Sequence, residues 1–296
     1  MTAGTTPADA LPTNWGRWGD TDELGTLNFI TDDSRARGAA AVRSGRTVSL
    51  AHPITPVTLA GGGAVPHGSS PMPAPVQQML MFTGSPAPAL ADVLIVNTHH
   101  IAMTHVDALV HIPVDGHVYP GVPVGQAANR GTIHHGSTTP FAAGITTAGT
   151  FLDLAPDGRL DPGYDIMAAD LDAAERRAGV RVQSGDALVV RGGWDVHRDL
   201  AEPLPTMTLD AIRWLAEREI SLLASDVGDR PPGPGSVPLL HAVALARLGL
   251  PLVDNTHVSD LADVCRELDR RQFLFVLGAF PVHGATGVPA SPLAIF

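Results

Sequence analysis

Histidine is the residue type in this chain that is best suited to catalysis or to metal binding. The 296 residues include 13 histidines, and several of them lie between Asn97 and His111. His105 and Asp107 are two residues apart, so in an extended strand their side chains project from the same face. An imidazole and a carboxylate together suit a borderline divalent cation such as zinc or manganese. His111 follows four residues later, where it is placed to move a proton to or from an activated water.

A single histidine in such a segment is more often a hydrogen-bonding side chain of a loop rich in glycine and proline. The spacing of His105, Asp107 and His111 taken together favours a functional role over that interpretation. Asp226, Asp229 and Arg230 form another polar group, just before Pro231-Pro232-Gly233, and their context predicts a solvated turn.

The sequence lacks the motifs of several common enzyme classes. The sequence contains neither a Gly-x-Ser-x-Gly elbow nor a phosphate-binding or dinucleotide-binding glycine loop. Serine hydrolases and nucleotide-dependent enzymes are therefore not the first choice. The pair His134-His135 looks like a set of metal ligands, but it has no partner at a useful spacing.

Composition restricts the partners and the compartment. The formal net charge is −11, which repels phosphate backbones and anionic membrane surfaces, so we expect neither nucleic acid nor membrane as a partner. Cys265 is the one cysteine, and we expect it to be a buried or half-buried small apolar residue with no activating base beside it. The start has no secretory pattern, and no apolar run is long enough to span a bilayer, which predicts a soluble, cytoplasmic protein.

Short β-branched runs alternate with amphipathic segments and predict an α/β layered core. The predicted strands cover 93–96, 149–154, 187–191, 222–225 and 273–277. The predicted helices cover 168–178, 209–218 with Thr208 as a cap, and 237–248. Residues 1–13 are expected to be a flexible tail and 14–296 a single domain. Residues 49–90, rich in Gly and Pro, are expected to form an extended wrapping loop that crosses a surface or an oligomer partner.

The segment Thr104-His105-Val106-Asp107-Ala108-Leu109-Val110-His111 resembles the core of the metal-dependent cyclase family, which includes bacterial kynurenine formamidase and isatin hydrolase. The family motif is H-x-G-T-H-x-D-x-P-x-H. The resemblance extends to residues 14–19 and 22–31, to the G-D-x-L-L-x-R-T-G-W stretch at 185–194, and to the terminal G-x-T-G-x-P-x-x-P loop at 284–292. It implies a single-domain swivelling β/β/α fold with a long N-terminal loop region.

The resemblance also implies roles for individual residues. His105 and Asp107 take the places of metal ligands, and His111 that of the catalytic histidine. The first ligand position of the motif falls on Ile101, which cannot bind a metal, and its glycine is replaced by Met103. His99 or His100 can substitute if the loop takes another path, and we favour His99.

Two later residues complete the expected site. In the family, a histidine and an acidic residue from later in the chain also lie near the metal. His241 and Asp254 fit these roles. Our expected site therefore has His111 and His241 in catalysis and His99, His105, Asp107 and Asp254 at the metal, with His257 nearby in sequence as a possible substitute.

The resulting hypothesis is a hydrolase that uses zinc or manganese to cleave a small amide, cyclic amide or lactone, with His111 as acid and base. The altered motif leaves two alternatives open. One is a noncatalytic relative that binds a small molecule, and the other is a cyclase or dehydratase that uses proton transfer without a metal. The family resemblance also implies a homodimer or a larger homo-oligomer.

Overall fold

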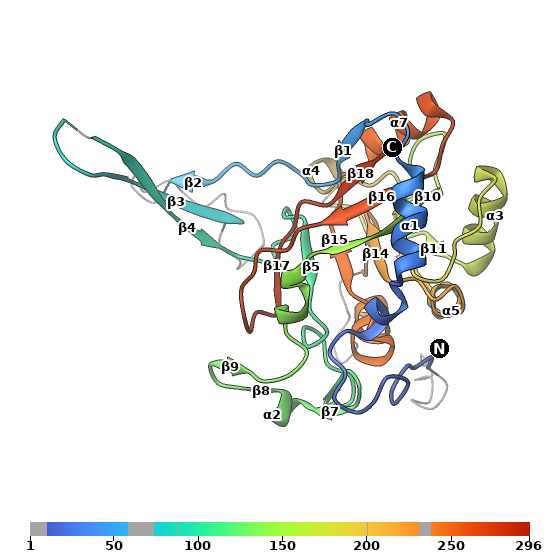
Figure 1. Ribbon diagram of the computed structural model, residues 1–296, viewed down its shortest axis with the longest axis horizontal. Coiled ribbons are helices and arrows are strands. Elements are labelled where there is room, and N and C mark those ends of the chain that lie inside the picture. Colours follow the sequence, from blue (N-terminus) through green and yellow to red (C-terminus); the bar gives the residue numbers. More distant parts are fainter. Residues whose placement is uncertain (1–10, 59–73, 87, 200, 231–237) are drawn as a thin grey trace.

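The computed structural model describes residues 11–58, 74–86, 88–199, 201–230 and 238–296. Its centre is one curled sheet of nine strands (Figure 1). In spatial order the strands are β1 (Thr47–Ser49), β18 (Leu293–Ile295), β16 (Gln272–Leu277), β10 (Ile145–Asp153), β12 (Ala187–Arg191), β14 (Leu222–Ser225), β15 (Leu252–Asp254), β5 (His105–Asp107) and β17 (Gly287–Pro289).

The four middle strands, from β10 to β15, are parallel, and the remaining pairs of the sheet are antiparallel. Strand β12 shows why its sequence is a continuous apolar run. Ala187 and Val189 belong to the core on one face of the sheet, whereas Leu188 and Val190 belong to the core on the other. A strand buried on both faces has no polar side to present to water.

Helices cover both faces of this sheet. The main helices are η2 (Gly25–Phe29), α1 (Asp32–Ala41), α3 (Ala168–Ala178), α5 (Leu209–Glu217), α6 (Leu239–His241) with its π-helical continuation η4 (Ala242–Leu248), and α7 (Ser259–Leu268). Side chains of α3, α5 and η4 pack in one core cluster, and those of α7 pack in the other. The two layers hold the middle strands, and with them the strand ends, in fixed positions.

Shorter elements surround the core: β6 (His117–Val118), β7 (Val122–Pro123), α2 (Val124–Ala127), β8 (Ala128–Asn129), β9 (Thr132–Ile133), η3 (Thr139–Ala143), β11 (Asp165–Ile166), α4 (Val196–Asp199) and β13 (Thr206–Met207). Within the described residues, none of the helices combines the length and the apolar character that crossing a membrane requires.

Most of the elements expected from periodicity are confirmed. The helix 168–178 and the strands 187–191 and 222–225 have the predicted bounds, and the strand at 149–154 begins earlier, at Ile145. Thr208 caps α5, because its hydroxyl accepts a hydrogen bond from the backbone N–H of Ala211. The expected helix 237–248 is present from Leu239, with Val237 outside the described residues.

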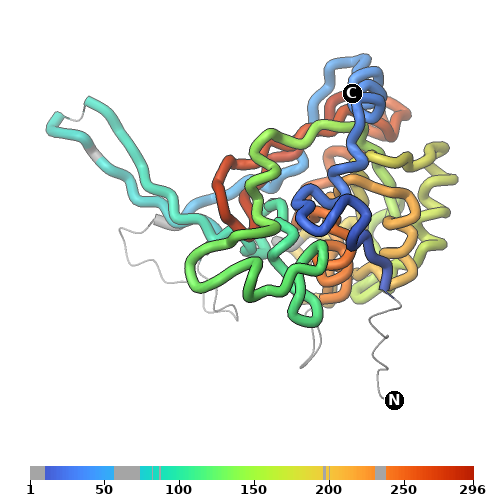
Figure 2. The backbone as a smooth tube through the Cα atoms, turned by 60° about the horizontal axis from the view of Figure 1, so that its bottom comes forward, coloured from blue at the N-terminus to red at the C-terminus, as the bar shows by residue number. Residues whose placement is uncertain are grey.

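The expected loop at 49–90 is the main correction. Residues 59–73 lie outside the described residues, but β2 (Val57–Thr58), β3 (Val76–Phe82) and β4 (Leu90–Val96) form a separate three-stranded sheet. Strands β3 and β4 make a long hairpin that projects from the body of the molecule in both views (Figures 1 and 2). The run Val-Gln-Gln-Met-Leu-Met-Phe of β3 lacks the alternation that marks a strand buried on one face, so periodicity did not indicate it.

The N-terminal boundary also differs from the expected one. Residues 1–10 of the expected tail lie outside the described residues. Leu11, however, packs against the core, and the Thr13 hydroxyl donates a hydrogen bond to the Arg247 carbonyl oxygen at 3.2 Å. Ordered contacts therefore begin before Asn14.

Candidate metal centre

Strand β5 places the first two candidate ligands. It lies between β15 and β17, with His105 opposite Asp254 and Asp107 opposite Gly287. Residues that pair across an antiparallel ladder share a face, as do residues two apart on one strand. His105, Asp107 and Asp254 therefore point to the same side, while Val106 points into the apolar core.

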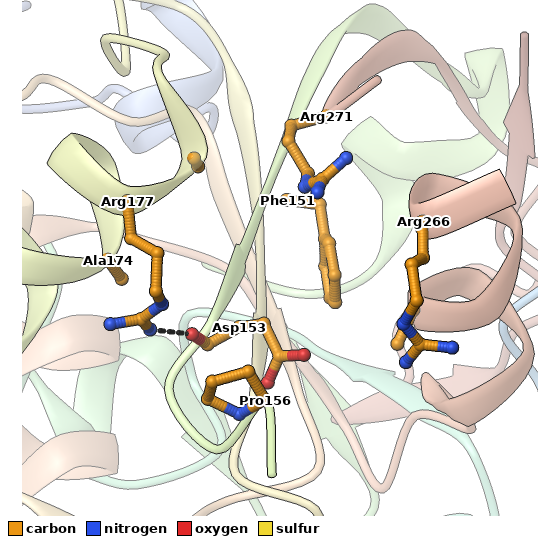
Figure 3. Close-up of a pocket in the computed structure, with 9 residues that line it drawn as sticks. Phe151, Asp153, Pro156, Ala174, Arg177, Arg266 and Arg271 are labelled. Carbon is orange, nitrogen blue, oxygen red and sulfur yellow. Dashed lines mark hydrogen bonds between the residues drawn. The ribbon is translucent and has the colours of Figure 1, made fainter. Parts of the chain in front are cut away.

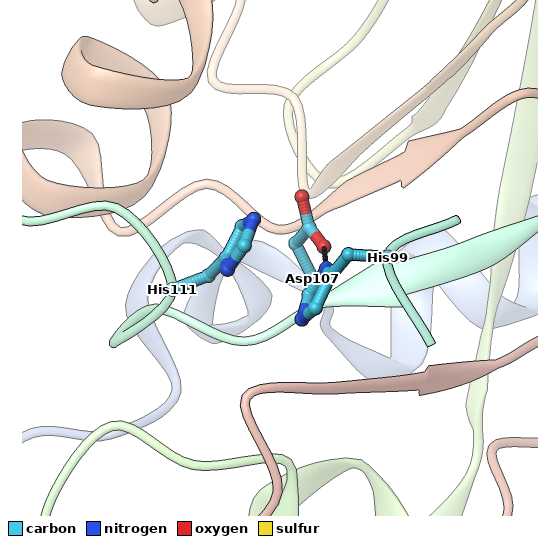
Figure 4. A group of neighbouring side chains, drawn as sticks. All are labelled: His99, Asp107 and His111. Carbon is cyan, nitrogen blue, oxygen red and sulfur yellow. Dashed lines mark ion pairs between the residues drawn. The ribbon is translucent and has the colours of Figure 1, made fainter. Parts of the chain in front are cut away.

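Asp107 is the centre of the cluster, and its side chain is fully buried. One of its carboxylate oxygens, Oδ1, lies 3.0 Å from His99 Nδ1 and 3.3 Å from His105 Nε2. The other oxygen lies 3.4 Å from Nε2 of His241. Figure 4 shows His99 and His111 side by side with the Asp107 carboxylate directed at His99. Two chain segments more than a hundred residues apart thus meet at one carboxylate.

These short distances are not hydrogen bonds. Neither Asp107 oxygen has a hydrogen-bond partner among the described residues, and His99 Nδ1 has none either. Buried polar atoms are normally satisfied, because an unsatisfied one costs the full free energy of its desolvation. Imidazole nitrogens gathered around a carboxylate that has no hydrogen-bond partner form a donor set that suits a divalent cation.

The outward nitrogen of each imidazole is held by an oxygen atom. His105 Nδ1 lies 2.8 Å from the Met103 carbonyl oxygen, to which it donates. His241 Nδ1 lies 2.8 Å from a carboxylate oxygen of Asp229, and His99 Nε2 lies 2.9 Å from the Thr286 hydroxyl oxygen. Such contacts fix the ring orientation. They direct the inner nitrogens of His99 and His105 at Asp107, and that of His241 at Asp107 and Asp254.

His99 reaches the cluster because the loop folds through two turns and because Gly287 leaves room. The backbone N–H of His100 donates to the carbonyl oxygen of Asn97, and that of Met103 donates to the carbonyl oxygen of His100. A Cβ atom at Gly287 would lie 2.7 Å from the His99 ring. The structure thus brings His99 to Asp107, as expected, whereas Nδ1 of His100 accepts a hydrogen bond from the Ala102 backbone within the turn.

His111 lies beside the ligand cluster. Its ring stacks on that of His99 with centroids 3.7 Å apart and planes 1° apart, and it lies 6.3 Å from the His241 ring. Burial lowers the pKa of His111 to about 4, so its imidazole is neutral near pH 7. A neutral, partly buried imidazole can accept a proton.

Neighbouring carboxylates raise the pKa values of two other imidazoles, those of His105 and His241. Burial lowers the pKa of His105, but Asp107, Asp254 and the Met103 carbonyl group together raise it, with a net rise to about 9. For His241, burial lowers the pKa and Asp254 raises it, and the result is well above the usual value. Nε2 of His241 lies 2.8 Å from a carboxylate oxygen of Asp254. A proton and a divalent cation therefore compete for the same inner nitrogens.

Asp229 and Asp226 correct the expectation of a solvated turn. Asp229 accepts hydrogen bonds from the backbone N–H groups of Leu240 and His241 at 2.9 Å, in addition to its contact with the His241 ring. Asp226 is buried and accepts from three consecutive backbone N–H groups, those of residues 192–194. The first carboxylate fixes the orientation of His241, and the second fixes the loop after β12.

The structure brings together all six residues expected at the site: His99, His105, Asp107, His111, His241 and Asp254. His257 is not among them, because its ring contacts that of His52 at 4.9 Å. His134 and His135 bond to Asn129 and to the Tyr119 carbonyl oxygen, respectively. Sequence reasoning missed the contributions of Asp229, Thr286 and Gly287, although the last two lie in the quoted terminal motif.

A separate hollow between α3 and α7, of about 110 Å³, is lined by arginines and apolar side chains (Figure 3). Its arginines already have partners. Arg177 donates to the Asp153 carbonyl oxygen, Arg271 donates to that of Cys265, and Arg266 pairs with Asp263. None of the candidate site residues lines it, so we do not place the chemistry there.

The curled α/β sheet and the buried His/Asp centre define the class of this protein. Residues 48–229 match the family model for the Cyclase family, described as "Putative cyclase". The chain therefore belongs to the cyclase family. The match ends before His241 and Asp254, which join the site through the fold alone. A search of curated proteins finds no significant match.

Solved structures share the fold. A structure described as a novel cyclase has a TM-score of 0.83 and 24% identity, over 99% of this chain and 100% of the other. Isatin hydrolase A from Labrenzia aggregata, bound to benzyl benzoate, has a TM-score of 0.58 and 19% identity, over 86% and 94% of the chains. An isatin hydrolase bound to the product analogue thioisatinate has a TM-score of 0.57 and 18% identity, over 90% and 99%. These likenesses show the expected α/β cyclase fold.

Proposed function

We propose that this protein is a metal-dependent hydrolase of a small amide, cyclic amide or lactone. The observation that carries the proposal is the buried Asp107 carboxylate. Both of its oxygens lack hydrogen-bond partners among the described residues, and the inner nitrogens of three imidazoles converge on them. Membership of a family of cyclases and a fold shared with isatin hydrolases support the hydrolytic reaction and the class of substrate.

His99, His105, Asp107 and Asp254, the ligands expected from the sequence, would hold the cation. His241 was expected in catalysis, but its Nε2 lies between carboxylate oxygens of Asp107 and Asp254, so we add it to the ligands. A divalent cation at this place supplies Lewis acidity, which lowers the pKa of water and polarises a carbonyl group. The donor set of nitrogen and carboxylate atoms suits zinc or manganese.

The residues of the chain supply positioning and proton transfer. The outer contacts of His99, His105 and His241 with Thr286, Met103 and Asp229 hold the rings so that they need not reorganise during the reaction. In this proposal His111 accepts a proton from the attacking water and passes it to the departing nitrogen or oxygen of the substrate. Its pKa, lowered by burial to about 4, leaves the ring neutral near pH 7, with a nitrogen lone pair free to accept that proton.

Two variants test the separate roles of the cation and of His111. Protein purified without chelators is analysed for zinc and manganese, and turnover of isatin and of a simple lactone is measured. His105→Ala should lose both metal and turnover. His111→Ala should keep the metal and lose turnover by about 10²- to 10⁴-fold, the usual contribution of a general acid or base.

His134→Ala is the matched control, because His134 lies outside the cluster and bonds to Asn129. It should keep both metal and turnover. Turnover that survives His105→Ala but not His111→Ala would point to metal-free proton transfer. Ligand binding with no turnover in the metal-loaded wild type would point to the noncatalytic alternative.

A further inference from the structure

A second hollow lies at the C-terminal ends of α1 and α3, beside the start of β16. Its volume is about 450 Å³, a size typical of sites for small molecules. None of the residues brought together at the candidate metal centre lines it. Strand β10, which borders the hollow through Ala148, is four strands away from β5 in the sheet. The hollow is therefore a separate place for a ligand.

Positive charge gathers at this hollow. Four of the chain's 19 basic side chains line it, against one of its 30 acidic side chains, that of Asp269. The four are Arg37, Arg43, Arg270 and Arg271. The chain as a whole carries a charge of −11, so the local sign is opposite to that of the molecule. At physiological ionic strength, exposed charges more than ~8 Å apart are largely screened from one another, so these arginines decide which ligands the hollow attracts.

Three of these guanidinium groups have no carboxylate partner. Arg37 pairs with the buried Asp186 at 2.9 Å. Among the described residues, none of the ion pairs involves Arg43, Arg270 or Arg271. Arg270 and Arg271 are half-buried, and removing part of a charged side chain from water is unfavourable without an opposite charge nearby. A bound anion would supply that charge.

Hydrogen bonds to the backbone hold two of these side chains. Nη2 of Arg270 donates to the Ala41 carbonyl oxygen at the end of α1. Nη1 of Arg271 donates to the Cys265 carbonyl oxygen, at 2.6 Å, in the last turn of α7. A guanidinium group has five N–H donors, so each side chain is fixed at one end and keeps donors for a ligand. The negative end of a helix dipole amounts to about half an elementary charge, which offsets only part of the charge of each arginine.

The remaining lining residues favour a ligand with an apolar part. Small residues at the ends of α1 and α3 leave the space open, and a valine and a phenylalanine add apolar surface. These residues are Ala40, Ala41, Ala178, Gly179, Val180 and Phe273. The side-chain amides of Gln183 and Gln272 supply further donors and acceptors. A bare inorganic anion would leave the apolar side chains in contact with water.

We propose that the hollow binds a small organic anion with at least two negative charges and an apolar part. Arginine side chains bind phosphate and carboxylate groups through parallel N–H···O bonds, so either group suits the site. Three guanidinium groups without a carboxylate partner, against the one carboxylate of Asp269, leave two positive charges for the ligand to balance. This chemistry differs from that of the substrate proposed for the metal centre, so the hollow is a site for a second compound.

Isothermal titration calorimetry with two probes tests the proposal. Phenyl phosphate and phenylsuccinate each carry two negative charges at pH 8 and an apolar ring, and they differ in the anionic group. Wild type should bind at least one of them at a single site, and the affinity should fall as salt is added. Binding of phenyl phosphate alone would assign a phosphorylated ligand, and binding of phenylsuccinate alone would assign a dicarboxylate.

Two arginine variants test whether the probes bind in the hollow. Arg43→Gln should weaken binding at least ~10-fold, the usual effect of losing a hydrogen bond to a charged group. Because Arg43 is exposed, this variant should fold as wild type does. Arg270→Gln should weaken binding by at least as much. Arg35→Gln is the matched control, since Arg35 pairs with Asp32 on α1 and does not line the hollow, and it should bind the probes as wild type does.

Titrations of Asp107→Ala separate the hollow from the metal centre, because this variant removes the central carboxylate of that centre. The probes should bind to it as tightly as to wild type. The proposal is overturned if neither probe binds to wild type, if both arginine variants bind the probes as tightly as wild type does, or if Asp107→Ala abolishes binding.

Discussion

The candidate metal centre and the hairpin of β3 and β4, called the arm below, depart from the usual distribution of residues in opposite ways. At the centre, Asp107 buries a charge with no hydrogen-bond partner among the described residues, and imidazoles surround it. On the arm, apolar side chains such as Leu94 and Ile95 are half exposed on both faces of a thin hairpin. Burying a charge and exposing an apolar surface both cost free energy.

The two regions differ in what is unfavourable about them: the centre buries charge, and the arm exposes apolar side chains. The centre gathers buried carboxylates whose charge a cation would balance, and its geometry is fixed by contacts from several elements. The arm exposes apolar side chains on both of its faces, and its geometry is fixed by its own ladder of backbone hydrogen bonds. The two regions adjoin in the sequence, since β4 ends at Val96 and His99 follows three residues later.

Replacing the buried carboxylate should have the largest effect and should affect the centre alone. In Asp107→Ala the affinity for zinc or manganese should fall more than ~100-fold, beyond the usual loss from a change in the outer contacts of a ligand. A chelator should lower the melting temperature of wild type but not of this variant, because only wild type is stabilised by bound cation. Scanning calorimetry and metal competition titrations measure both.

Asp92→Ala is the matched control, since it removes the one carboxylate of the arm and should leave the metal affinity unchanged. Both proteins should keep the wild-type mass in solution. If Asp107→Ala binds the cation as tightly as wild type does, the carboxylate is not a ligand and the comparison fails.

A smaller effect is expected from Asp229→Asn, which keeps the size of the side chain but removes its charge. His241 would lose the carboxylate that holds its Nδ1 at 2.8 Å, so its inner nitrogen would be less well oriented. The affinity for the cation should fall by about 10- to 100-fold, as measured by competition with a chromophoric chelator.

Asp165→Asn serves as the comparison for Asp229→Asn, because the Asp165 carboxylate is exposed and pairs with Arg230. It should have no effect on the metal affinity. A wild-type affinity in Asp229→Asn would mean that the backbone, and not the carboxylate, positions His241.

Cys265 represents the ordinary core and should show the smallest effect. It is buried, and burial raises its pKa from 9.0 to about 12. Native protein should therefore react with iodoacetamide at pH 8 far more slowly than protein unfolded in denaturant. Between pH 9 and 12 the unfolded chain releases the thiol proton while the native state keeps it, so this group makes stability fall as pH rises. Rapid labelling of the native protein would contradict this account.

Much of the centre could be predicted from local sequence. His105 and Asp107 share a face because any strand alternates its side chains, and the residues of β12 and β14 form strands wherever both faces are buried. Thr208 caps its helix through a contact three residues away. These features depend on neighbours in the sequence, which is why a single chain is enough to predict them.

Contacts between distant segments could not be predicted in this way. The local sequence predicts that Asp229 belongs to a turn before a proline pair. Only the fold brings its carboxylate to the backbone N–H groups at the start of α6. The need for glycine at position 287 arises from the His99 ring, which lies almost two hundred residues earlier. The strand expected at 93–96 is present within β4, whereas β3 has no alternating pattern, because its side chains are exposed on both faces.

The sequence by itself determined which side chains can bind a cation and which short segments form strands and helices, because spacing and local propensity act over a few residues. Only the tertiary structure decided that His99 and not His100 faces Asp107, that Asp229 holds His241, and that the apolar side chains of the arm remain outside the core. Each of these depends on which segments pack together, and packing is a property of the whole chain.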